Sequence, residues 1–158
     1  MSAQIWQNNH QSDARLLLLE DNDELAASLE EYLALYSCTT DRVTNGAEGL
    51  RRILNRRFDF ILCDMVMPGF PGDMFYLAVE RVKPALCQRF VFMTGDKGDS
   101  KWETFVDEIG GVLLWKPFQM HTLLEALQSV WGKSLPARPS PFRIPDAVAG
   151  LPLARMHG

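Results

Sequence analysis

The chain has 158 residues, 47% hydrophobic and 23% charged, which predicts one globular domain with a proper core. The formal net charge of −4 argues against nucleic-acid binding, and no apolar stretch approaches the ~20 residues that a membrane-spanning helix requires. The N-terminus lacks the features of a signal peptide and the three cysteines lack metal-type spacing. We therefore expect a cytoplasmic protein with reduced thiols that binds neither nucleic acid nor membranes.

Five short runs predict strands, in chain order over residues 15–19, 39–43, 58–63, 90–93 and 111–115. Four of them are mainly apolar, as strands buried on both faces are, whereas 39–43 is mixed and is predicted at an edge. Apolar residues at helical spacing lie between and after these runs. The second and third helices are predicted to face inward with Ala47, Leu50 and Leu54, and with Phe75, Val79 and Val82. This alternation predicts the α/β class, with a (βα)5 doubly wound parallel sheet of five strands.

The composition changes at the two ends of the chain. Residues 1–13 are polar and are predicted to be a disordered N-terminal segment, followed by one domain over 14–132. Residues 133–158 hold five of the nine prolines and are predicted to be a Pro-rich C-terminal tail without a fold of its own. That tail is expected to be disordered or a linker, although five apolar residues would allow it to dock on a surface, namely Phe142, Ile144, Val148, Leu151 and Leu153.

Four of the predicted strands end at polar residues, namely Glu20-Asp21, Asp64, Thr94 and Lys116. Because parallel strands present their carboxyl ends at one edge of the sheet, these side chains are expected to lie together. Three neighbouring carboxylates repel one another unless a cation compensates them, and Mg²⁺ prefers oxygen ligands. An ammonium and a hydroxyl beside such a cation suit phosphoryl transfer, with Asp64 as the nucleophile.

Each of these residues also has an ordinary structural interpretation. Glu20 and Asp21 are suited to cap the helix that follows them, Thr94 is an ordinary hydroxyl at the end of a strand, and Lys116 is an ordinary solvated lysine. The joint occurrence at four strand ends favours the functional interpretation, because a coincidence of all four is far rarer than any one of them.

These motifs resemble the receiver domain of response regulators in two-component signalling, a flavodoxin-like fold of the chemotaxis-regulator type. The resemblance is carried by Glu20-Asp21, by residues 64–69 (Asp-Met-Val-Met-Pro-Gly), by Thr94-Gly95 and by residues 116–118 (Lys-Pro-Phe). The order of these motifs matches the family, as do the intervals of 30 residues (64 to 94) and 22 residues (94 to 116).

The resemblance implies that Asp64 is a phosphoacceptor, which receives a phosphoryl group from a histidine kinase or a histidine phosphotransfer protein. It implies that Glu20, Asp21, Asp64 and the backbone carbonyl of Val66 hold Mg²⁺. Thr94 and Lys116 would be the switch hydroxyl and the lysine that contacts the phosphoryl group, with a cis peptide bond between Lys116 and Pro117.

One position departs from the family pattern. The family often places an aromatic residue three positions before the lysine, where its ring turns inward during switching, but Leu113 occupies that position here. Leu113 would then have to repack, or Trp115 or Phe118 would have to report the change. The sequence around Gly95-Asp96 also resembles, more loosely, the receivers of hybrid sensor kinases.

Four functions remain in competition at this stage. The first is a receiver that acts as a phosphorylation-controlled binding module or relay rather than as an enzyme, with slow self-dephosphorylation and an unknown downstream protein partner. No DNA-binding output domain is recognisable in this chain, and its charge pattern does not decide whether it forms a homodimer. The alternatives are a receiver module from a hybrid histidine kinase, a degenerate receiver that serves as a scaffold, and a Mg²⁺-dependent aspartyl-phosphate phosphohydrolase. Val66 weighs against the phosphohydrolase, since such enzymes commonly carry a second acid at that position.

Overall fold

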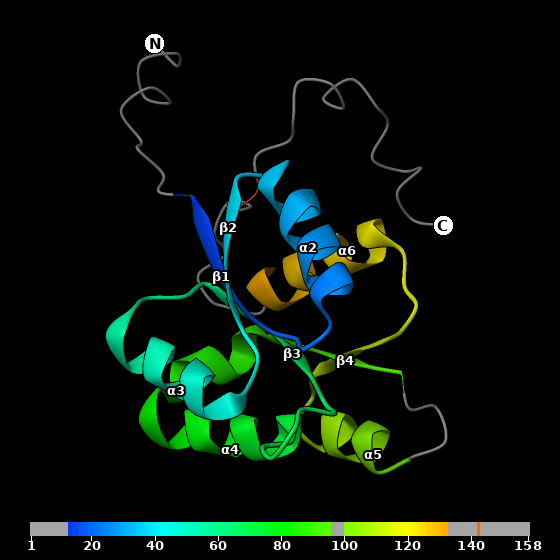
Figure 1. Cartoon of the computed structure of the whole chain (residues 1–158). Coiled ribbons are helices and arrows are strands. Elements are labelled where there is room, and N and C mark those ends of the chain that lie inside the picture. Colours follow the sequence, from blue (N-terminus) through cyan, green and yellow to red (C-terminus); the bar gives the residue numbers. More distant parts are fainter. Residues whose placement is uncertain (1–12, 96–99, 133–141, 143–158) are drawn as a thin grey trace.

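The computed structural model describes residues 13–95, 100–132 and 142 and shows a five-stranded parallel sheet between two layers of helices (Figure 1). The sheet order is β2-β1-β3-β4-β5, so the predicted doubly wound α/β fold is confirmed. The strands are β1 (Ala14–Leu19), β2 (Cys38–Val43), β3 (Phe60–Asp64), β4 (Phe90–Thr94) and β5 (Val112–Trp115). The helices are α2 (Asp23–Ala34), α3 (Gly46–Asn55), α4 (Gly72–Val82), α5 (Ser100–Glu108) and α6 (Met120–Gly132), with a 3-10 turn η1 (Pro84–Arg89) before β4.

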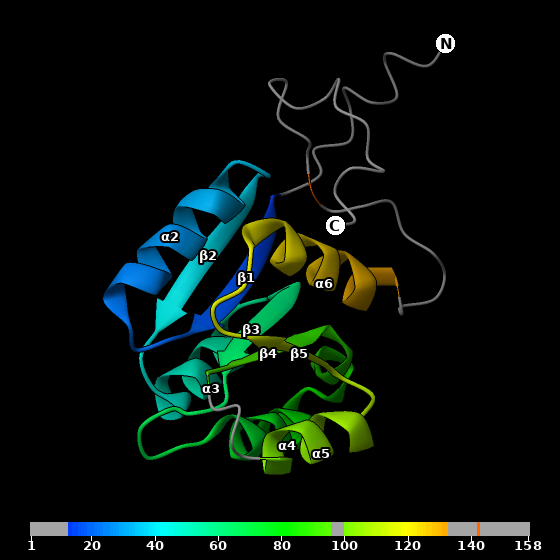
Figure 2. The ribbon, with the colours of Figure 1, turned by 90° about the vertical axis from the view of Figure 1, so that its right-hand side faces the viewer.

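The sheet separates two hydrophobic cores (Figure 2). Helices α2 and α6 pack on one face, and α3, α4 and α5 pack on the other. The strands β3 and β4 are buried along their whole length, and β1 is buried except at Arg15, which explains their continuous apolar sequence. The strand β2 lies at an edge of the sheet, as its mixed sequence predicts.

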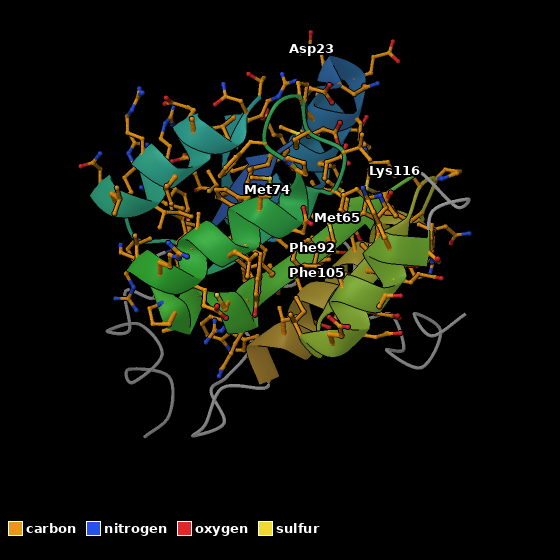
Figure 3. The ribbon with its side chains drawn as sticks, turned by 90° about the horizontal axis from the view of Figure 1, so that it is seen from below. Asp23, Met65, Met74, Phe92, Phe105 and Lys116 are labelled. Atoms are coloured by element: carbon orange, nitrogen blue, oxygen red, sulfur yellow. The ribbon has the colours of Figure 1, made fainter. Side chains whose placement is uncertain are left out.

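Aromatic side chains fill much of the core on the α4 and α5 side of the sheet. Phe92 of β4 and Phe105 of α5 meet edge to face at 5.9 Å between ring centroids, and Figure 3 shows them between these two helices. Tyr76 of α4 contacts both rings, with centroid distances of 6.0 Å to Phe92 and 5.6 Å to Phe105. These contacts fix α4 and α5 against the central strands of the sheet.

The helix faces differ in part from the prediction. In α3 the buried residues are Gly46, Gly49 and Ile53, whereas Ala47 is exposed and Leu54 is 57% exposed. The reason is steric, because α3 packs through its glycines, and a Cβ on Gly49 would come within 3.2 Å of the Phe75 ring. Glycine has no side chain and is not counted as an apolar residue in the helical pattern. The sequence therefore predicts an inward face of α3 that is shifted by one residue from the observed face.

Helix α4 shows a smaller error at its end. Phe75 and Val79 are buried as predicted, but Val82 is 42% exposed because the helix ends there, and Tyr76 is buried in its place. At the other end of α4, a Cβ on Gly72 would lie 3.0 Å from the Asp64 carbonyl oxygen and 3.0 Å from Cα of Met65. The start of α4 therefore packs directly against the backbone that carries Asp64, which fixes the position of that residue.

The three cysteines are free thiols, as expected, with Cys38 and Cys63 buried. Burial raises the pKa of the Cys63 thiol well above its ordinary value, so this side chain behaves as a small apolar residue. Within the described residues, no helix combines the length and the apolar character that crossing a membrane demands.

The described residues include one position from the predicted C-terminal tail. Phe142 is 7% exposed and stacks on Phe60 of β3, with 5.4 Å between ring centroids and 12° between planes. Trp131 of α6 approaches the same Phe60 ring at 5.6 Å. Residues 1–12 and the rest of the predicted tail lie outside the described residues, so the proposed limits of the domain at 14 and 132 stay a prediction.

Because Phe142 completes this aromatic cluster, we expect Phe142→Ala to lower the free energy of unfolding by about 2–4 kcal/mol, through lost burial and the cavity left beside Phe60. Chemical denaturation followed by circular dichroism measures the change. Leu35→Ala is the matched control, since Leu35 is 62% exposed and its removal should cost less than about 0.5 kcal/mol. Equal stability of the two variants would show that Phe142 does not belong to the core.

Candidate functional site

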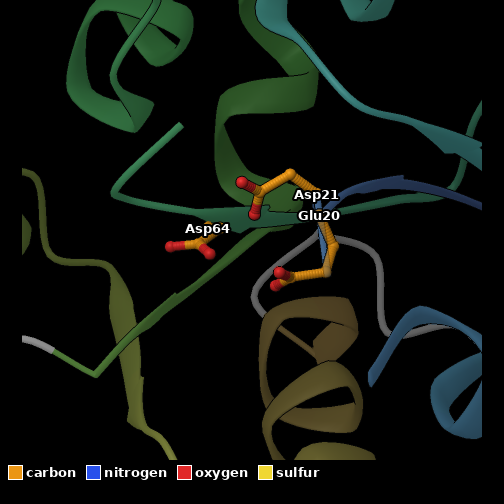
Figure 4. Close-up of side chains that lie close together, drawn as sticks. All are labelled: Glu20, Asp21 and Asp64. Atoms are coloured by element: carbon orange, nitrogen blue, oxygen red, sulfur yellow. The ribbon is translucent and has the colours of Figure 1, made fainter. Parts of the chain in front are cut away.

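Three carboxylates gather at the carboxyl edge of the sheet, as the strand ends predict (Figure 4). Glu20 and Asp21 follow β1 directly, and Asp64 is the last residue of the neighbouring strand β3. One carboxylate oxygen from each lies within 4.8 Å of the others. Glu20 and Asp64 are 1% and 5% exposed, whereas Asp21 is exposed. The cluster therefore has two buried members and one that faces solvent.

Lys116 joins two of these carboxylates. It follows β5, and its Nζ donates hydrogen bonds of 2.7 Å to Oε2 of Glu20 and 2.7 Å to Oδ2 of Asp64. A backbone hydrogen bond of 2.8 Å from the Lys116 N–H to the Thr94 carbonyl fixes its place at the end of β5. The ammonium group thus compensates part of the negative charge at the edge of the sheet.

Backbone N–H groups occupy the other oxygens of the two buried acids. The N–H of Val66 donates to Oδ1 of Asp64 at 2.9 Å, and the N–H of Asn22 donates to Oε1 of Glu20 at 3.1 Å. Both donors are backbone N–H groups, which every residue except proline carries, so the amino-acid sequence does not indicate these two contacts. Together with Lys116 they orient both carboxylates before any ligand binds.

The electrostatics of the site follow from burial and from these hydrogen bonds. Burial raises the pKa of Glu20 above its ordinary value, and the hydrogen bond from Lys116 offsets only part of that rise. Burial alone would lower the pKa of Lys116, but its hydrogen bonds to Asp64 and Glu20 more than compensate, and its pKa is raised. Lys116 is therefore an ammonium at neutral pH.

The donor set fits Mg²⁺. Three carboxylates offer oxygen ligands within 4.8 Å of one another, and hard divalent cations prefer such ligands. The exposure of Asp21 leaves one side of the cluster open to the water molecules that Mg²⁺ usually retains. An ion bound by Glu20, Asp21 and Asp64 would also relieve the repulsion among the three negative charges. The Val66 carbonyl stays a predicted further ligand.

The remaining residues of the predicted site lie at the same edge. Thr94 is fully buried at the end of β4, one position beyond Met93, which pairs with Asp64 in the strand register. The cis peptide bond between Lys116 and Pro117 is confirmed. Val66 is 54% exposed, so an apolar side chain and not an acid stands on the solvent side of Asp64.

The surroundings of Thr94 matter because position 113 carries a leucine where the family often has an aromatic residue. Leu113 of β5 is half-buried and packs in the core beneath α4 and α5. In the register between β4 and β5, Thr94 pairs with Trp115. Paired residues of adjacent strands present their side chains on the same face of the sheet, so Trp115 and Thr94 are neighbours on one face.

Comparison with known proteins agrees with this geometry. The sequence model of the response regulator receiver domain matches residues 16–128. The chain belongs to the response regulator receiver domain family. Receiver domains are signalling modules of two-component systems rather than enzymes in the ordinary sense, and an acidic cluster such as the one formed by Glu20, Asp21 and Asp64 is typical of their Mg²⁺ site.

Individual relatives are similar at the level expected within a broad family. The transcription factor SKN7 of Candida albicans is 25% identical over 112 residues, which cover 71% of this chain and 20% of that protein. The chemotaxis protein CheY4 of Vibrio cholerae is 25% identical with a TM-score of 0.65 and covers 75% of this chain and 98% of CheY4. A CheY-like receiver domain protein from Methanospirillum hungatei has a TM-score of 0.68 at 22% identity, over 75% of this chain and 93% of that one, which shows the shared fold. This chain therefore spans only a fifth of SKN7 but nearly all of CheY4.

Lys116 and a metal ion act on the same carboxylates with the same sign of charge. We expect Lys116→Met to bind Mg²⁺ about fivefold more tightly, because removing the ammonium lifts a repulsion on the order of 1 kcal/mol. Isothermal titration calorimetry with MgCl₂ measures the dissociation constant. Arg81→Met, which removes an exposed cation from the far end of α4, is the control and should leave the affinity unchanged. Weaker binding by Lys116→Met would contradict the expected competition.

Proposed function

We propose that this receiver domain accepts a phosphoryl group on Asp64, from the phosphohistidine of a histidine kinase or a histidine phosphotransfer protein. The observation that carries the proposal is the placement of Asp64, which is buried, oriented by the Val66 N–H and contacted by Lys116, and lies within 4.8 Å of two further acids. Such an arrangement supports one carboxylate as a nucleophile and the other two as ligands of Mg²⁺.

In the proposed reaction a carboxylate oxygen of Asp64 attacks phosphorus. The new O–P bond forms as the P–N bond to the donor histidine breaks, and the imidazole leaves with the electron pair and takes up a proton. Bound Mg²⁺ supplies charge neutralisation for the phosphoryl oxygens. Lys116, which contacts Oδ2 of Asp64, is placed to transfer its hydrogen bond to a phosphoryl oxygen, and the Val66 N–H keeps the other carboxylate oxygen in place.

Two competing functions are less well supported. A phosphohydrolase needs a second acid or base beside the aspartyl phosphate, but Val66 offers only an exposed apolar side chain there. A degenerate scaffold would not need two buried carboxylates, each hydrogen-bonded by both Lys116 and a backbone N–H group. Slow loss of the phosphoryl group to water remains part of the proposal.

We propose another protein as the downstream partner of the domain. This chain matches 20% of the length of SKN7 and 50% of the length of the transcriptional regulatory protein DltR of Streptococcus agalactiae, so both relatives carry further sequence. Whether the chain acts as a free-standing receiver in the cytoplasm or as a receiver module of a hybrid histidine kinase is therefore decided by sequence outside the domain. In both settings the phosphoryl group would regulate contact with another protein or with a second copy of the chain.

For the switch, we propose that Trp115 takes the role of the aromatic that is absent at position 113. A phosphoryl group on Asp64 adds negative charge and acceptor oxygens, which attract the hydroxyl of Thr94. Movement of Thr94 frees space beside its register partner, Trp115, which is half-buried on edge strand β5. Leu113 lies two residues earlier on the same face and would repack beneath it.

The phosphoacceptor role predicts a single modified residue. Incubation with a small phosphodonor and Mg²⁺ should add the mass of one phosphoryl group to the wild-type protein, as measured by intact mass spectrometry, and Asp64→Asn should remain unlabelled. Asp107→Asn alters an exposed acid on α5 and should be labelled like the wild type. Equal labelling of Asp64→Asn and the wild type would refute the proposal.

The switch predicts where the fluorescence changes. Phosphodonor and Mg²⁺ should alter the tryptophan emission of the wild type, and Trp115→Phe should lose most of that change, because its indole lies beside Thr94. Trp131→Phe should retain it, since Trp131 packs on Phe60 at the other end of the strands. A full response in Trp115→Phe that is still labelled on Asp64 would exclude Trp115 as the moving aromatic.

A further inference from the structure

Arg42 reaches the acidic edge from the outermost strand of the sheet. It lies on β2, where it pairs with Leu18 of β1, and its side chain is 22% exposed. Its Nε donates a hydrogen bond of 3.0 Å to the backbone carbonyl of Glu20, and its Nη1 lies 2.7 Å from Oδ1 of Asp23. Arg42 therefore contacts both ends of the segment that contains Glu20 and Asp21, without contacting either carboxylate in the hydrogen bonds that the structure shows.

The contact with Glu20 continues the sheet where the strands stop pairing. The register of β1 and β2 ends at Leu19 and Val43, and the Glu20 N–H still donates to the Val43 carbonyl at 3.2 Å. Beyond that point β1 turns toward α2, and the Arg42 guanidinium takes the carbonyl of Glu20. The Arg42 side chain thus supplies a hydrogen bond to the backbone of Glu20 at the point where the pairing of β1 and β2 ends.

The conformation of this backbone decides whether the acids converge. Glu20 points into the protein and Asp21 toward solvent, yet both place an oxygen within 4.8 Å of one from Asp64. Such an arrangement depends on the dihedral angles of two adjacent residues at a point where the strand has ended. Small rotations there separate the ligand atoms, and metal affinity is sensitive to ligand geometry.

We propose that Arg42 is a positioning residue for the metal site, and that Mg²⁺ affinity depends on it although it does not touch the ion. The inference rests on the proposed function only in taking Mg²⁺ as the cation of the acidic cluster. Arg42 holds the Glu20 carbonyl and the start of α2, and thereby keeps the carboxylates of Glu20 and Asp21 gathered beside Asp64.

Two simpler roles for Arg42 predict different results. If it acted only as a nearby positive charge, its removal would strengthen Mg²⁺ binding, as expected for Lys116→Met. If Arg42 acted only in folding, its ion pair would add little to the free energy of unfolding, because the Asp23 side chain is 89% exposed and exposed ion pairs contribute little to stability. Its Nη2 is also buried without a hydrogen-bond partner among the described residues, which offsets part of any gain.

The test is a Mg²⁺ titration of Arg42→Met, followed by calorimetry and by amide shifts in NMR spectra, with thermal unfolding measured in the absence of the ion. We expect the dissociation constant to rise about fivefold or more, while the backbone spectrum away from residues 20–23 stays unchanged. Arg51→Met is the matched control, since Arg51 also pairs with a nearby acid, Glu48, but lies on α3 away from the acidic edge. Its affinity should equal that of the wild type.

Two further variants separate the contacts. Asp23→Asn removes the ion pair and keeps the hydrogen bond to Glu20, so its affinity should change less than twofold. Arg42→Lys keeps the charge but cannot reproduce both arms of the guanidinium, so its affinity should fall between those of Arg42→Met and the wild type. If Arg42→Met does not fold, Arg42→Lys decides, and an unchanged affinity would overturn the proposal.

Unchanged or tighter Mg²⁺ binding by a folded Arg42→Met would also overturn it. Failure of the proposed function gives a different result, namely a wild-type protein that binds Mg²⁺ but is not labelled by the phosphodonor. In that case the loss of Mg²⁺ affinity in Arg42→Met would still support the positioning role.

Discussion

The site depends on one interaction, the contact of the Lys116 ammonium with the carboxylates of Glu20 and Asp64. Two nearly buried acids at adjacent strand ends repel each other and lose their hydration. Both effects destabilise the folded state unless a positive charge lies nearby. Lys116 supplies that charge from the third strand end, and backbone N–H groups satisfy the oxygens that it leaves. The fold therefore holds a strongly polar group of side chains at the end of an otherwise apolar sheet.

The same arrangement connects the chemistry to the rest of the domain. A metal ion or a phosphoryl group at Asp64 would change the charge that Lys116 balances, and Lys116 directly follows β5. The Lys116 N–H donates a hydrogen bond to the Thr94 carbonyl. Trp115, which precedes Lys116 in the chain, is the register partner of Thr94. In the proposed switch, a change of charge at Asp64 would therefore act on β5, which lies at an edge of the sheet.

Much of this architecture follows from the sequence alone. The apolar runs are typical of strands buried on both faces, their alternation with helices favours a parallel sheet, and parallel strands bring Glu20, Asp21, Asp64 and Lys116 to one edge. Other features depend on contacts that no local pattern encodes. Helix α3 faces inward through Gly46 and Gly49, Val66 and Asn22 act through their backbone, and Arg42 meets Glu20 across 22 positions of the chain. These contacts arise from packing and from strand register, which only the folded chain reveals.

The stacking of Phe142 on Phe60 links a residue beyond α6 to the strand that carries Asp64. Phe60 begins β3 and Asp64 ends it, so the buried aromatic ring and the Asp64 carboxylate lie at opposite ends of a single five-residue strand. A change of charge at Asp64 would therefore act on one end of a strand whose other end is packed by Phe142 and Trp131.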